Sequence, residues 1–237
     1  MITPQEIADK IKSNGRYWIA FTGASDTSCE WVHPNWREIV EYVLQIEMTN
    51  YMSDWKKSEW GVKGFNFGYD GATTKDILDR VDYIKLISPD LVIGLMGSND
   101  EIFGITIPEH IENIKKIINE LQTKVVWCTS ITSGRSAKNS RYEPYAKACM
   151  QIPGNENQQI IDTFEIFAKF PLEKIYTFKS EDNPDEDLKE GDPDLQHPNQ
   201  LGNAYIAKVI LKEVFGIEFD PELYWKTNLA AEKFPKY

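Results

Sequence analysis

Short apolar runs alternate along the chain with segments whose apolar residues recur at helical spacing, and this alternation limits the possible folds more than any other feature. The apolar runs predict strands at 17–22, 64–67, 91–96, 124–130 and 159–162. The helical patterns cover 3–13, 35–48, 73–84, 108–121 and 199–215. Strands separated by helices pair in parallel, with helices on both faces of the sheet. We therefore predict an α/β fold, a three-layer α/β/α arrangement around a parallel sheet of about five strands.

The composition is that of a folded globular chain. Of its 237 residues, 41% are hydrophobic and 27% charged, and we find no repeat, low-complexity tract or linker. We therefore expect a single domain over residues 1–237. Lys and Arg number 26 against 37 Asp and Glu, so the net charge is −11 and the isoelectric point is near 4.9. This acidic balance argues against nucleic acid or an anionic membrane surface as the main partner.

The cysteines and the N-terminal residues indicate the cellular compartment in which we expect the protein. Cys29, Cys128 and Cys149 are an odd number without CxxC spacing, which favours reduced thiols over a disulfide framework or a zinc site. The first residues lack the basic and apolar regions of a secretion signal, and no run reaches the roughly 18 apolar residues of a membrane span. We expect a cytoplasmic protein without metal or cofactor, although a signal peptide removed beforehand would leave no trace.

Small and polar residues follow the predicted strands. Ser25 comes after the first strand, Gly71 after the second and Asn99 after the third. Asp194 and His197 stand in a loop just before the last predicted helix. Ligands of a parallel sheet gather at the carboxyl ends of its strands, so we expect these five residues to lie together.

A hydrolytic serine needs a base, and the histidines of this chain identify one. The base takes the serine proton, and a partner must fix the tautomer of its ring. Of the three histidines, His110 lies in the first turn of an amphipathic helix, where we expect a solvated side chain, and His33 has no carboxylate placed to orient it. His197 has Asp194 three residues earlier. We therefore predict Ser25 as nucleophile, His197 as base and Asp194 as the orienting carboxylate.

An acyl-transfer site also needs donors for the oxyanion of the tetrahedral intermediate. Asn99 offers a side-chain NH₂ group after a strand. The backbone N–H of Gly71 can approach closely because glycine has no Cβ, and the N–H of Ser25 is a third candidate.

These segments, in this order, resemble the consensus blocks of the SGNH (GDSL-type) hydrolases. That family is named for a Ser, a Gly, an Asn and a His, which match Ser25, Gly71, Asn99 and His197, and its carboxylate three residues before the histidine matches Asp194. The resemblance spans residues 17–215. It implies the flavodoxin-like SGNH hydrolase fold and a serine esterase that works through an acyl-enzyme, without a cofactor.

The nucleophile segment departs from the family pattern in one residue. Gly23-Ala24-Ser25 stands where the family has Gly-Asp-Ser, so the usual acidic residue is absent and Asp26 is the candidate to replace it. Thr27 occupies the position of the second Gly in a G-x-S-x-G elbow. This argues against the α/β-hydrolase fold, the main competing serine esterase.

Several residues are candidates for the substrate pocket. Trp31 could stack on a sugar ring or line an acyl pocket, and Arg135 and Tyr142 follow the fourth strand, where family members commonly shape the pocket. Residues 180–194 carry eight acidic residues and one lysine, which indicates a solvated loop leading to the predicted base. A field of this sign disfavours anionic substrates.

The expected substrate is a small-molecule carboxylic ester. A short acyl ester, such as acetyl, on a carbohydrate or another small neutral compound is the first expectation. Hydrolysis of lysophospholipids or thioesters, and acyl transfer to an acceptor other than water, remain open on the same residues. Two alternatives from other classes are a non-catalytic carbohydrate-binding module and a flavodoxin-like nucleotide-binding protein.

Overall fold

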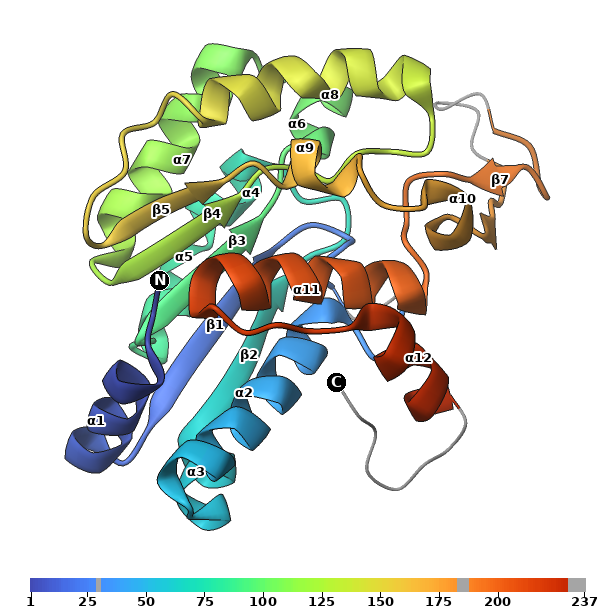
Figure 1. Cartoon of the computed structure of the whole chain (residues 1–237). Helices are drawn as coiled ribbons and strands as arrows, with labels where there is room; N and C mark the ends of the chain where they lie inside the picture. The colour runs from blue at the N-terminus through green and yellow to red at the C-terminus, as the bar shows by residue number, and fades with distance from the viewer. Residues whose placement is uncertain (29–30, 183–187, 230–237) are drawn as a thin grey trace.

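The computed structural model describes residues 1–28, 31–182 and 188–229, and its centre is a five-stranded parallel sheet (Figure 1). The strand order is β2-β1-β3-β4-β5, and every neighbouring pair is parallel. The strands are β1 (Tyr17–Gly23), β2 (Val62–Gly68), β3 (Leu91–Leu95), β4 (Lys124–Cys128) and β5 (Gln158–Ile161). The predicted α/β fold and its parallel sheet are thus confirmed.

Helices cover both faces of the sheet. They are α1 (Pro4–Asn14), α2 (Trp36–Met52), α3 (Trp55–Gly61), α4 (Thr74–Asp79), α5 (Val81–Leu86), α6 (Ser98–Ile102), α7 (Ile107–Leu121), α8 (Ser136–Cys149), α9 (Thr163–Phe167), α10 (Leu172–Ile175), α11 (Gln200–Phe215) and α12 (Pro221–Leu229). In the described residues, no helix is both long enough and apolar enough to cross a lipid bilayer.

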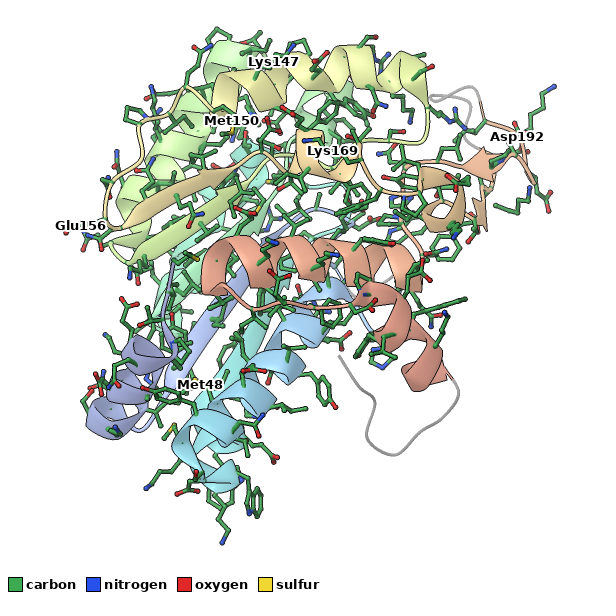
Figure 2. The ribbon with its side chains drawn as sticks, in the orientation of Figure 1. Met48, Lys147, Met150, Glu156, Lys169 and Asp192 are labelled. Carbon is green, nitrogen blue, oxygen red and sulfur yellow. The ribbon has the colours of Figure 1, made fainter. Side chains whose placement is uncertain are left out.

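Alternation along the strands divides the core into two layers. Ile19 and Phe21 pack with α1, α2 and α11, whereas Ala20 between them packs with α4, α5 and α7 on the opposite face. Met48 of α2 is one of the side chains that fill the first layer (Figure 2). Both faces of the sheet are therefore covered by helices, so a ligand site is expected at the carboxyl edge of the sheet.

Local capping explains where four of the helices begin. Capping boxes at Thr3–Glu6, Asn35–Glu38, Thr73–Asp76 and Thr106–Glu109 start α1, α2, α4 and α7. The helix expected over 73–84 is interrupted at Arg80, whose ψ of 7° ends α4 before α5 begins. The antiparallel hairpin of β6 (Phe178–Lys179) and β7 (Pro193–Asp194) is an addition to the predicted elements.

Gly23 lets the chain leave β1 in a tight turn. Its φ is +157°, and a Cβ at this position would lie 2.4 Å from the carbonyl oxygen of Leu95 and 2.4 Å from Oγ1 of Thr27. Only glycine fits between β3 and the following turn. The turn places Ser25 just beyond the carboxyl edge of the sheet.

Asp100 joins the loops that follow β2 and β3. Its fully buried carboxylate accepts hydrogen bonds from the Thr74 N–H (2.7 Å) and the Thr74 hydroxyl (2.5 Å). It also lies 2.6 Å from Nδ1 of His110, whose Nε2 is 3.1 Å from Sγ of Cys149. The carboxylate only accepts, so Nδ1 carries the proton and Nε2 faces the thiol. The expectation of a solvated His110 is therefore wrong, because this network fully buries its ring.

We predict that Asp100→Ala destabilises the fold by about 3–5 kcal/mol, because it leaves several buried donors without an acceptor. Urea denaturation would measure the free energy of unfolding. Asp79→Ala is the matched control, since the Asp79–Lys75 pair is exposed and its loss is expected to leave the free energy of unfolding nearly unchanged. Equal losses in the two variants would contradict this account.

Candidate active site

Ser25, His197 and Asp194 form a hydrogen-bonded chain at the carboxyl edge of the sheet. Oγ of Ser25 lies 3.1 Å from Nε2 of His197, and Nδ1 of His197 lies 2.7 Å from Oδ2 of Asp194. Ser25 follows β1, Asp194 ends β7, and His197 lies in the turn before α11. Residues 172 positions apart in the sequence thus meet at hydrogen-bond distance.

The hydrogen bonds fix the tautomer of His197. The second oxygen of Asp194 accepts from the backbone N–H groups of Gln196 (2.9 Å) and His197 (3.2 Å). Because the Asp194 carboxylate can only accept, the ring proton of His197 lies on Nδ1. Nε2 is then free to accept a hydrogen bond from the Ser25 hydroxyl. This is the arrangement that a general base requires.

Acidic residues around the imidazole favour its protonated form. Burial disfavours the imidazolium of His197, and the hydrogen bond to Asp194 opposes that effect. The charges of Asp26 and Asp70 add to this bond, so the pKa of His197 is raised above its ordinary value of 6.5. For Asp194, burial alone would raise the pKa, but hydrogen bonds from the side chain and N–H of His197 bring it below 3.8.

Asp26, the residue after Ser25, is partly buried, and the pKa of its carboxyl is shifted. Its Oδ1 is buried and has no hydrogen-bond partner among the described residues. Burial raises the pKa of Asp26 to about 6, and only the His197 imidazolium opposes this effect. Ala24, where the family has an acidic residue, is itself buried in the layer that contains Ile77.

Three of the residues expected to supply oxyanion donors, Ser25, Gly71 and Asn99, line the same cavity. Asn99 is 7% exposed, and its Nδ2 donates one hydrogen to the Ala72 carbonyl (2.9 Å), which leaves a second hydrogen for a ligand. Gly71 has a φ of +70°, a conformation that favours glycine. No acceptor among the described residues takes the N–H of Gly71 or of Ser25.

A cavity of about 450 Å³ opens beside these groups. Its polar side chains carry four carboxylates and one ammonium group, from Asp70, Glu181, Asp182, Asp194 and Lys179. The described residues that line it are Ser25, Trp31, Asp70, Gly71, Asn99, Ile102, Phe103, Lys179, Ser180, Glu181, Asp182, Leu188, Asp194, Gln196 and His197. Part of the acidic loop, residues 183–187, lies outside the described residues.

The structure brings one of the three expected pocket residues to this cavity, Trp31. Arg135 lies outside its described lining, because its guanidinium donates to the Pro193 carbonyl (3.1 Å) and so holds the β7 hairpin. Tyr142 is also outside, because its side chain is 1% exposed and packs against Ile102, which does line the cavity.

The sequence interpretation did not assign Asp70 or Lys179 to the cavity. Asp70 accepts a hydrogen bond from Nε1 of Trp31 (3.0 Å). Its position directly before Gly71 could have indicated that it lines the cavity. Lys179 gave no comparable signal, because it belongs to a two-residue strand, which has no detectable period.

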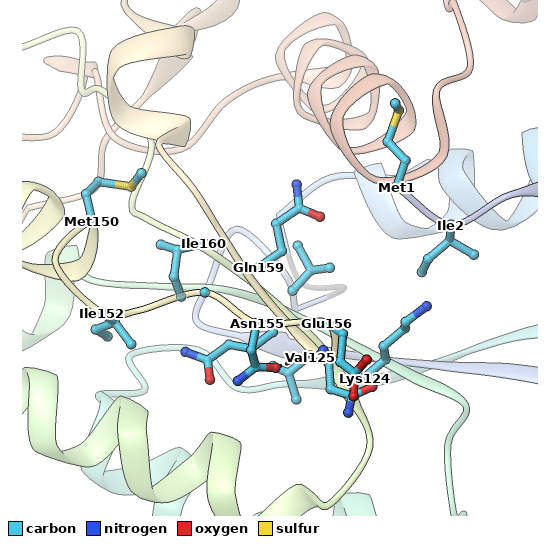
Figure 3. Close-up of a pocket in the computed structure, with 14 residues that line it drawn as sticks. Met1, Ile2, Lys124, Val125, Met150, Ile152, Asn155, Glu156, Gln159 and Ile160 are labelled. Atoms are coloured by element: carbon cyan, nitrogen blue, oxygen red, sulfur yellow. Dashed lines mark hydrogen bonds between the residues drawn. The ribbon is translucent and has the colours of Figure 1, made fainter.

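A second and larger cavity, of about 610 Å³, lies at the amino ends of β4 and β5 (Figure 3). It therefore opens at the other edge of the sheet. Its described lining holds Lys124 and Glu156 as charged residues, with no histidine, cysteine or serine. Its described lining therefore lacks the serine and histidine of a serine esterase site.

The chain is similar to known proteins over most of its length. The model of the GDSL-like Lipase/Acylhydrolase family matches residues 20–205. The GDSL esterase/lipase CPRD49 of Arabidopsis thaliana is 22% identical over 237 residues, which cover 88% of this chain and 83% of that protein.

Solved structures share the fold. Axe2, an acetylxylan esterase from Geobacillus stearothermophilus, has a TM-score of 0.63 at 18% identity and covers 85% of this chain and 95% of its own. The lipase Lip_vut3 from a goat rumen metagenome has a TM-score of 0.60 at 12% identity, over 81% of this chain and 94% of its own. The family match extends from before Ser25 to beyond His197. The chain therefore belongs to the GDSL-like lipase/acylhydrolase family, the SGNH hydrolases, and is a carboxylic ester hydrolase.

Proposed function

We propose that the chain is one catalytic domain in which Ser25 is the nucleophile, His197 the general base and Asp194 its orienting carboxylate. The observation that carries this proposal is the continuous hydrogen-bonded chain of the three side chains. Oγ of Ser25 lies 3.1 Å from Nε2 of His197, and Nδ1 of His197 lies 2.7 Å from Oδ2 of Asp194. Asn99 and the N–H groups of Gly71 and Ser25 would hold the oxyanion.

The proposed reaction has two halves. Oγ of Ser25 attacks the ester carbonyl while its proton moves to Nε2 of His197, and a tetrahedral oxyanion forms. The intermediate collapses as His197 gives this proton to the leaving alcohol, which leaves an acyl group on Ser25. Water then attacks the acyl-enzyme with His197 again as base, and the carboxylic acid and the free serine result.

We infer that the substrate is a short acyl ester of a neutral compound, with an acetylated carbohydrate first. The charge of the cavity supports this choice, because four carboxylates outnumber the single Lys179 and would repel an anionic substrate. Trp31 supports a sugar, because this aromatic residue is 43% exposed and lines the cavity. The fold shared with an acetylxylan esterase agrees with the same choice.

Removal of the nucleophile tests the mechanism. We predict that Ser25→Ala lowers kcat/KM for p-nitrophenyl acetate by at least about 10⁴-fold, because it removes the hydroxyl on which the acyl-enzyme forms. Ser140→Ala is the matched control, since this serine of α8 is exposed and its hydroxyl donates to the Ala137 carbonyl (2.9 Å), and the rate of this variant should equal that of the wild type. Turnover retained by Ser25→Ala would refute the proposal.

The pH dependence follows from the charges around His197. The base works only when neutral, and its pKa is raised, so kcat/KM should fall as the pH drops through a midpoint above 6.5. Asp26→Asn removes a charge that stabilises the imidazolium, so the midpoint should move to lower pH. Asp9→Asn on exposed α1 should leave it in place. A midpoint that is the same in all three proteins would contradict this electrostatic account.

The charge of the cavity should set the preference among substrates. We predict a higher kcat/KM for acetylated xylo-oligosaccharides than for acetyl-CoA, measured by release of acetate. In Glu181→Gln/Asp182→Asn the advantage of the neutral substrate should shrink, because the repulsion of the anion is reduced. An advantage unaffected by this double change would show that cavity charge does not select the substrate.

A further inference from the structure

The indole of Trp31 lies face to face on the imidazole of His197. The ring centroids are 3.7 Å apart and the planes differ by 5°. The imidazole is thus bounded at three places, by Asp194 at Nδ1, by Ser25 at Nε2 and by Trp31 on one face.

This stack has a geometry that neutral rings do not prefer. Two neutral aromatic rings favour an offset or edge-to-face arrangement with centroids about 4.5–7 Å apart, because the faces of both rings are negative. The two rings here are nearly parallel, and their centroid distance of 3.7 Å is shorter than this range. A cation above the face of an indole is attracted instead, and Trp is the best aromatic residue for this interaction.

A hydrogen bond keeps Trp31 in this position. Its side chain is 43% exposed, and its Nε1 donates to Oδ1 of Asp70 (3.0 Å). Asp70 directly precedes Gly71, one of the proposed oxyanion donors. The indole is therefore tied to the loop after β2 while it covers a ring that belongs to the segment before α11.

We propose that Trp31 is a positioning residue whose indole, held by Asp70, stabilises the imidazolium that forms on His197 as Ser25 loses its proton. This inference rests on the proposed function of Ser25 and His197. An interaction accelerates a reaction only when it is stronger in the transition state than in the ground state. The stack meets this condition, because the charge that it favours appears during the attack.

Other charged groups also act on this imidazole and must be kept constant in a test. Asp194 faces it from β7, Asp26 from the turn after β1 and Asp70 from the loop after β2. Across the cavity, Lys179, Glu181 and Asp182 belong to the hairpin segment. A substitution of Trp31 by an uncharged residue changes none of these charges.

The test compares Trp31→Leu, Trp31→Phe and the control Trp55→Leu, which removes a half-exposed tryptophan of α3. We expect Trp31→Leu to lower the pKa of His197 by about half a unit to one unit and to reduce kcat on the alkaline plateau by about 3- to 10-fold. Trp31→Phe keeps an aromatic face and should lie between Trp31→Leu and the wild type. Trp55→Leu should match the wild type.

Two readouts separate this inference from the proposed function. The pKa of His197 is measured by NMR titration of the imidazole protons in a Ser25→Ala background, where the three histidines are assigned by His33→Gln and His197→Gln. Urea midpoints establish that each variant is folded. Turnover retained by Ser25→Ala alone would refute the proposed function, whereas the NMR titration would still decide the stacking.

Two results would overturn the inference on Trp31. One is an unchanged or higher pKa of His197 in Trp31→Leu. The other is a rise in KM with unchanged kcat, which would make Trp31 only a wall of the substrate pocket.

Discussion

The parallel register of three strands determines where the reactive groups of this hydrolase lie. Gly23 at the end of β1 pairs with Gly68 of β2 on one side and with Leu95 of β3 on the other. The proposed nucleophile and the two loop donors follow these three partners within four residues. The sheet therefore supplies Ser25, Gly71 and Asn99 from one edge, and a shift of the register would separate them.

The buried network around Asp100 and the hydrogen-bonded chain around His197 share a carboxylate–histidine pair but differ in exposure. In each, a carboxylate accepts from Nδ1 of a histidine, and Nε2 faces a hydroxyl or thiol. Around His110 the units are fully buried, and burial raises the pKa of the Cys149 thiol to about 12, so it stays protonated. Around His197 a cavity gives access to the serine. Access rather than residue type thus separates a structural array from a reactive one.

Much of the fold could be predicted because its signals are local. Short segments rich in apolar residues indicate the strands. The capping box of Thr3 and Glu6 indicates the start of the first helix within four residues. Ser25, Gly71 and Asn99 could be proposed because each follows a predicted strand, and His197 because Asp194 stands three residues before it. The burial of His110 could not be predicted, since a helical period does not reveal that the Asp100 carboxylate lies 2.6 Å from its Nδ1. Nor could the burial of Tyr142 be predicted, since a position after a strand does not reveal that this side chain packs in a cluster with Ala146 and Phe164.

The proposed triad joins residues 172 positions apart, and this separation ties reactivity to complete folding. The nucleophile is synthesised early, whereas its base belongs to the last part of the sheet domain to leave the ribosome. Until that segment docks, Ser25 is an ordinary hydroxyl without an activating partner. Under the proposed mechanism, a chain truncated before His197 therefore lacks the base, and activity requires that this long-range contact has formed.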